Sequence, residues 1–159
     1  MTRAKLYHFE HAEFIRAGRD WWLDMDQGLL VKLDVLRKLW GKPIHLSKNG
    51  KAIGRLGGRG DLSQHNLNKW GAVRAVDCYP DGLETEDDVR RFLSLARHVG
   101  FTGYGAYHGI PRGIMVHLDV RHDRQPDDPA TWGGLVAPDE AGAWRTRYVS
   151  LDDVLKELP

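Results

Sequence analysis

Two stretches of the chain repeat apolar residues at the three- and four-residue spacing of an amphipathic helix. The first runs from Asp26, which suits the start of a helix, to Gly41, which suits its end. The second begins after Thr85, which can form a capping box with Asp88, and it ends at Gly100. We therefore expect a helix in each stretch, with one apolar face packed on the core.

Other stretches alternate apolar and polar residues, which predicts β-strands over residues 43–47, 74–79 and 113–121. A turn is expected directly after the second of these strands, where proline and glycine occur together. In the third strand, the alternation places His117 and Asp119 on one face. The other face is apolar and consists of Ile114, Val116, Leu118 and Val120. A histidine is thus predicted to share a strand face with a carboxylate.

Glycine and proline indicate irregular structure elsewhere. Residues 48–60 form a Gly-rich basic stretch that we predict to be a loop. Residues 122–138 hold several prolines and a Gly-Gly pair, so they are also predicted to be a loop. Residues 145–149 are expected to form an edge strand, and Ser150 can cap a short closing helix.

The predicted helices and strands do not alternate regularly along the chain. This order favours an α+β fold with a small, mainly antiparallel sheet and flanking helices. The chain has 159 residues, which suits one domain over residues 1–159. No repeat or long linker divides it, and we expect a monomer.

Composition narrows the classes of partner. Apolar residues make up 42% of the chain and charged residues 28%, as in a globular protein. The formal net charge is +1 and basic residues are spread along the sequence, so no nucleic-acid partner is expected. There is no 18-residue apolar run and no apolar signal segment near Met1, which predicts synthesis in the cytoplasm without a signal peptide and no membrane partner.

Three side chains are candidates for a metal site. His65 lies in a polar segment between the Gly-rich loop and the second strand, whereas Asp77 and His117 lie inside predicted strands. A buried carboxylate or imidazole needs a strong partner, and one metal ion would serve all three. Zinc hydrolases use three such ligands and leave a fourth position for water.

Each candidate also has a simpler explanation when it is taken alone. A single histidine is more often a hydrogen-bonded core or surface residue than a ligand. Asp77 could pair with Arg74 or with a backbone amide, and His117 could pair with Asp119. The residues by themselves leave these alternatives open.

The local sequences around the three candidates resemble the metallopeptidases of the zinc D-alanyl-D-alanine carboxypeptidase group. That group includes many phage endolysins and shares its core fold with hedgehog signalling domains. The resemblance is carried by Ser63-Gln64-His65, by Gly71 to Asp77 with its alanines, and by Val116-His117-Leu118-Asp119. The helix and strand before the first motif and the Gly-rich stretch 103–107 are similar as well, so residues 26–121 are covered.

The resemblance implies a hedgehog/DD-peptidase-like fold and zinc held by His65, Asp77 and His117. It implies a peptidase that cuts a peptide bond next to a D-amino acid in the peptidoglycan stem peptide, of phage or prophage origin. Such an enzyme would act on the cell wall after release from the cytoplasm. Relatives also hold the substrate carboxylate with an arginine of the Gly-rich loop, a role for which Arg59 or Arg55 is available.

Two departures from the family bear on these expectations. The stretch between His65 and Asp77 is longer than in relatives, so residues 66–72 are expected to loop out. Relatives carry a general base just before the last ligand, where this chain has Ile114 and Met115. Asp119 is therefore our first candidate base and His108 the second, with a positioning role for Asp119 as the alternative.

The missing base residue keeps a second hypothesis open. In the first, the protein is a zinc peptidase of the cell wall. In the second, it is a non-catalytic phage structural or wall-binding module that retains the metal site for stability.

Overall fold

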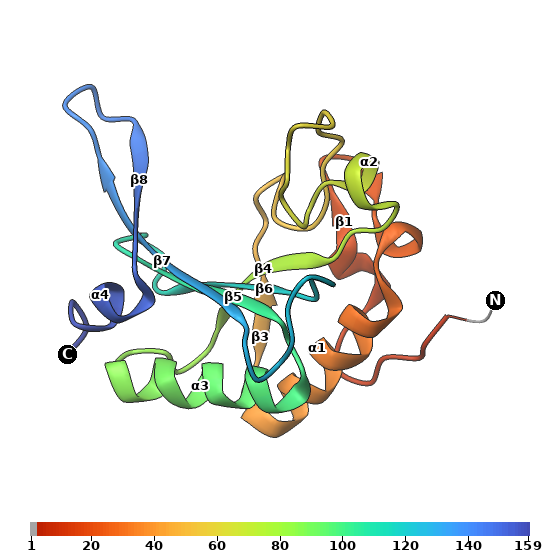
Figure 1. Cartoon of the computed structure of the whole chain (residues 1–159), viewed down its shortest axis with the longest axis horizontal. Helices are drawn as coiled ribbons and strands as arrows, with labels where there is room; N and C mark the ends of the chain where they lie inside the picture. Colours follow the sequence, from red (N-terminus) through yellow and green to blue (C-terminus); the bar gives the residue numbers. More distant parts are fainter. Residues whose placement is uncertain (1–2) are drawn as a thin grey trace.

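A six-stranded mixed sheet with the strand order β3-β4-β6-β5-β7-β8 organises the molecule (Figure 1). The computed structural model describes residues 3–159. The strands of the sheet are β3 (Ile44–Leu46), β4 (Ala75–Pro80), β6 (Met115–Asp119), β5 (Gly103–His108), β7 (Ala130–Pro138) and β8 (Trp144–Val149). β5 and β7 run parallel, and every other pair of neighbours in this order is antiparallel. The predicted α+β class is confirmed.

Both of the long predicted helices form, and each is capped by residues close to its ends. Helix α1 (Gln27–Trp40) starts where the Asp26 side chain accepts a hydrogen bond from the Leu29 amide. Helix α3 (Glu86–Val99) starts at the Thr85–Asp88 capping box. Both helices end on a glycine in the left-handed conformation, as predicted from the sequence. The shorter elements are η1 (His11–Phe14), β1 (Ile15–Arg16), β2 (Arg19–Asp20), η2 (Trp22–Asp24), α2 (Leu67–Trp70) and α4 (Leu151–Leu155).

The sheet has a core face and an open face. Buried residues of α1 and α3 form one hydrophobic cluster with Val116 and Leu118 of β6. Since side chains alternate along a strand, His117 and Asp119 lie on the opposite face. In Figure 1 the β7–β8 hairpin and the segment 47–66 both rise on the side of the sheet away from α3.

The prediction of a loop over residues 122–138 was wrong for its second half, which forms β7. This strand is hydrogen-bonded to β5 on one side and to β8 on the other. Because β5 is distant in sequence, a local pattern could not reveal that pairing. Its glycines do not mark a turn. Gly133 is required because α4 packs closely on the strand: a side chain there would collide with Val154, and its Cβ would lie 2.6 Å from the Ser150 carbonyl oxygen.

Gly133→Ala is therefore expected to lower the free energy of unfolding by about 1–3 kcal/mol, because the backbone of Ser150 must move away. The matched control is Gly58→Ala, since a Cβ at Gly58 meets no atom within 4 Å. Thermal and urea unfolding measure both variants. Equal stabilities for the two would contradict the packing of α4 on β7.

Candidate metal centre

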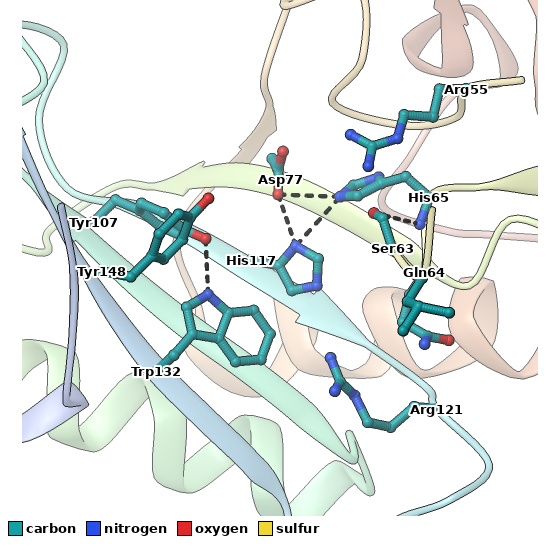
Figure 2. A pocket seen from close by; sticks show the side chains of 11 residues that line it. Arg55, Ser63, Gln64, His65, Asp77, Tyr107, His117, Arg121, Trp132 and Tyr148 are labelled. Carbon is teal, nitrogen blue, oxygen red and sulfur yellow. Dashed lines mark hydrogen bonds and ion pairs between the residues drawn. The ribbon is translucent and has the colours of Figure 1, made fainter. Parts of the chain in front are cut away.

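His65, Asp77 and His117 converge on the open face of the sheet (Figure 2). His65 Nε2 lies 3.2 Å from His117 Nδ1 and 3.4 Å from Asp77 Oδ1. Asp77 Oδ1 lies 3.0 Å from His117 Nδ1. The three residues predicted from the sequence thus form one group that could hold a metal ion.

Strand pairing and loop hydrogen bonds position this group. Asp77 of β4 and His117 of β6 are direct partners in the antiparallel register, so their side chains stand next to each other on one face. His65 lies near the end of the segment 47–66. This segment is held against the sheet by a hydrogen bond of 2.8 Å from the Asp77 amide to the Ala52 carbonyl oxygen. Residues 66–72, which were expected to loop out, contain the short helix α2.

The second nitrogen of each imidazole determines where its lone pair points. His65 Nδ1 lies 2.7 Å from the Ile53 carbonyl oxygen, which can only accept, so Nδ1 carries the hydrogen and Nε2 has the lone pair. His117 Nε2 lies 3.0 Å from Asp119 Oδ2 and donates to it, which leaves the lone pair on Nδ1. Two lone pairs and a carboxylate oxygen therefore face one another. Such a set needs a proton or a metal ion between its members.

The spacing of these atoms fits zinc. Bonds of about 2.0–2.1 Å in a tetrahedral zinc site place neighbouring ligand atoms about 3.3 Å apart. The three separations in the ligand group, 3.0, 3.2 and 3.4 Å, bracket that value. The donor set of two imidazoles and one carboxylate is also one that zinc hydrolases use.

Charges within the group shift its pKa values in opposite directions. Burial alone would raise the pKa of Asp77, but the imidazoles of His65 and His117 outweigh it and hold that pKa well below its ordinary range. Burial alone would lower the pKa of His117, but hydrogen bonds and charges from Asp119 and Asp77 raise it to about 9. Protein groups alone thus favour a cation at this point.

Asp119 lies behind His117, away from the other two ligand atoms. Its side chain is fully buried, and Oδ2 accepts from His117 Nε2 while Oδ1 accepts from Arg121 Nε at 2.9 Å. Burial would raise the pKa of Asp119, yet Arg121 and His117 lower it to about 2. Of the two roles considered from the sequence, this geometry favours the positioning role, in which Asp119 orients His117, over that of general base.

Two glycines of β5 make room for this arrangement. Gly103 pairs with Asp119 and Gly105 pairs with His117 in the β5–β6 register. A side chain at Gly103 would collide with the carboxylate of Asp119, and a Cβ at Gly105 would lie 2.5 Å from Trp132 Nε1. The absence of side chains at these two glycines therefore leaves the space that the Asp119–Arg121 pair and Trp132 occupy.

A pocket of about 470 Å³ opens over the ligand group. Besides the three ligands, its lining includes Arg55, Leu62, Ser63, Gln64, Tyr107, Arg121, Trp132 and Tyr148. Figure 2 shows the two tyrosines and Trp132 on one side of the ligands, and Arg55, Ser63 and Gln64 on the other. The pocket thus has an aromatic wall and a polar wall.

The sequence-based candidates for substrate binding and proton transfer fall in different places. Arg55 lines the pocket and is held by Asp61, to which it donates through Nε at 2.7 Å and Nη2 at 2.6 Å. Arg59 is exposed and does not line the pocket. His108 lines a separate pocket together with residues of β7 and β8. Of these three, Arg55 alone is placed to contact a molecule at the ligand group.

Sequence reasoning missed the aromatic wall. Trp132 Nε1 donates to the Tyr107 hydroxyl at 2.7 Å, and its ring packs against that of His117 with centroids 4.9 Å apart. Trp132 lies in the segment predicted to be a loop, and Tyr148 lies in the predicted edge strand. No local pattern marked them as neighbours, because β5 and β7 pair across a long stretch of sequence.

Comparison of the chain with protein-family models, with curated proteins and with solved structures gave no significant match. Among residues 3–159, no helix is both long enough and apolar enough to span a bilayer.

Proposed function

We propose that the protein is a zinc-dependent peptidase that hydrolyses a peptide bond next to a D-amino acid in bacterial peptidoglycan, of phage or prophage origin. The observation that carries the proposal is the convergence of two imidazole lone pairs and one carboxylate oxygen at zinc-like separations. The family resemblance of the three ligand motifs supplies the substrate class. The hedgehog/DD-peptidase fold and action at the cell wall belong to the same proposal.

In this proposal His65, Asp77 and His117 hold the metal, and Asp119 orients His117. Bound zinc supplies a water molecule with a pKa near 7 and polarises the amide carbonyl. Arg55 and Arg121 each use Nε and Nη2 for their partner carboxylates, so Nη1 of each takes no part in those pairs. These groups and the tyrosine hydroxyls are hydrogen-bond donors suited to hold substrate oxygens as negative charge develops.

One observation favours the second candidate function, a non-catalytic wall-binding or phage structural module. Asp77 is the only carboxylate, and His65 and His117 are the only histidines, among the described residues that line the pocket. All three belong to the ligand group. The pocket therefore offers no further carboxylate or imidazole as a general base, in keeping with Ile114 and Met115 at the family's base positions.

Digestion of purified peptidoglycan separates the two functions. Protein stripped with a chelator and restored with one equivalent of zinc is incubated with cell walls over a range of pH, and new amino groups are counted. The peptidase is expected to release them only after zinc is restored. Full zinc binding with no new amino groups at any pH would overturn the peptidase proposal and leave the binding module.

A further inference from the structure

A second pocket of about 450 Å³ adjoins the pocket over the ligand group. The two pockets share five lining residues: Arg55, His65, Asp77, Tyr107 and Tyr148. Two of the three candidate ligands therefore lie where the pockets meet. Each pocket alone is within the range of about 300–1,000 Å³ that is typical of ligand sites.

The first pocket continues from the ligand group toward Gln64, Arg121 and Trp132. The second continues in another direction, between the segment 47–66 and the β7–β8 hairpin. Lys51 and Asn49 line it from the segment, and Trp144 and Thr146 line it from the hairpin. Space with polar and aromatic lining is thus present on both sides of the ligands.

Strand β8 presents one row of side chains to this space. Trp144, Thr146 and Tyr148 alternate along the strand and all line the second pocket. Trp144 is 55% exposed and Tyr148 is 69% exposed, although both are large aromatic residues. Arg147, which alternates to the other face, lines a different pocket. Exposed aromatic side chains in a row along a groove are suited to contact an extended chain.

We infer that the two pockets form one groove, which holds an extended peptide on both sides of the ligand group, and that the protein cleaves an internal bond as an endopeptidase. This inference rests on the proposed function and adds that the cleaved bond is internal to the peptide. Hydrolysis consumes one water: the amide C–N bond breaks, the carbonyl carbon becomes a carboxylate, and the nitrogen leaves as an amine.

The alternative is removal of a terminal residue, which needs a closed end to the site and a cation committed to the terminal carboxylate. The two arginines that line the pocket over the ligand group, Arg55 and Arg121, already bind Asp61 and Asp119 through two nitrogens each. The groove also continues past the ligands toward Lys51 and Trp144. Both features favour a substrate that continues beyond the cleaved bond.

Two defined substrates test the inference. One is a cross-linked pair of stem peptides, in which the chain extends on both sides of a D-alanyl bond. The other is an uncross-linked stem peptide that ends in free D-alanyl-D-alanine. With zinc-loaded protein, kcat/KM is expected to be at least about tenfold higher for the cross-linked substrate. Faster release of free D-alanine from the second would overturn the inference but support the peptidase; no cleavage of either would overturn both.

A variant in the second pocket, which is the distal pocket of the groove, makes this test more specific. Trp144→Ala is expected to lower kcat/KM for the cross-linked substrate about tenfold and to leave the terminal substrate unaffected. Arg147→Ala, on the same strand but outside the groove, is the matched control and is expected to change neither. An unchanged kcat/KM of Trp144→Ala for the cross-linked substrate would show that the distal pocket does not hold the peptide.

Binding gives a second measurement that does not depend on turnover. A cross-linked peptide whose D-alanyl amide is replaced by a reduced CH₂–NH bond is titrated into zinc-loaded protein and followed by NMR. The amides of Gln64 and Arg121 and those of Lys51 and Trp144 are all expected to shift. Shifts confined to one of the two pockets would overturn the inference.

Discussion

Replacing His117 by alanine is expected to lower zinc affinity by about 10²–10⁴-fold and, under the proposed function, to abolish hydrolysis of peptidoglycan. This loss of affinity corresponds to about one third of the roughly 10–16 kcal/mol of binding free energy that a protein zinc site provides, because His117 is one of three protein ligands. His117 is also the candidate ligand whose Nδ1 lone pair is directed by Asp119. Competition with a chromophoric chelator measures affinity, and metal analysis of the purified variant measures occupancy.

The control for this variant is His45→Ala. His45 is half-exposed on β3, where it pairs with Asp81 at 3.1 Å, away from the ligand group. It is expected to keep one zinc per chain and full activity. If His117→Ala retained wild-type zinc affinity, the metal centre itself would be wrong, and the proposed function would fail with it.

The same centre predicts a pH dependence of zinc binding. Asp119 and Asp77 raise the pKa of His117 to about 9, above its ordinary value. Below about pH 9, zinc must therefore displace a proton that His117 shares with Asp77. Apparent zinc affinity is expected to rise with pH, by up to about tenfold per unit, and to level off near pH 9. Calorimetry in buffers of different ionisation enthalpy should detect the released proton; no release at pH 7.5 would contradict this account.

Asp119→Ala is expected to have the second largest effect, on stability as well as on the metal. It removes the acceptor that orients His117, which lowers zinc affinity by about 10–100-fold. It also leaves the half-buried guanidinium of Arg121 without its carboxylate, at a cost of about 3–5 kcal/mol in the free energy of unfolding. Urea unfolding and the chelator competition measure the two effects separately.

Removing a general base would have a different effect from removing a residue that orients His117, so Asp119→Ala also decides between the two roles of Asp119. Loss of a base would reduce kcat and leave zinc affinity unchanged. Asp119→Asn keeps an acceptor for His117 but not the charge, and it is expected to recover part of the zinc affinity. Asp128→Ala is the matched control, because Asp128 forms an exposed pair with Arg124 at 3.2 Å that contributes at most about 1 kcal/mol.

Local patterns predicted the parts of this fold that depend on neighbouring residues. The two long helices begin and end where Asp26, Thr85 and the following glycines indicated, because caps are satisfied within four residues. Alternation predicted β4 and β6 to within two residues, and it placed His117 and Asp119 on one face. It did not predict β7, whose hydrogen bonds and close packing come from β5, β8 and α4.

The properties of the candidate ligands were likewise determined partly by the local sequence and partly by the tertiary structure. The sequence by itself determined which residues have metal-binding side chains and, through the resemblance of their motifs, that His65, Asp77 and His117 belong together. The tertiary structure decided what each atom can do. It placed the Ile53 carbonyl where it accepts a hydrogen bond from His65 Nδ1, and this leaves the Nε2 lone pair directed at the site. It buried Asp119 behind His117, and it completed the groove with aromatic residues of a hairpin that no local pattern connects to the ligands. Side-chain type is a property of single residues, whereas lone-pair direction, burial and groove shape depend on segments that meet only when the chain folds.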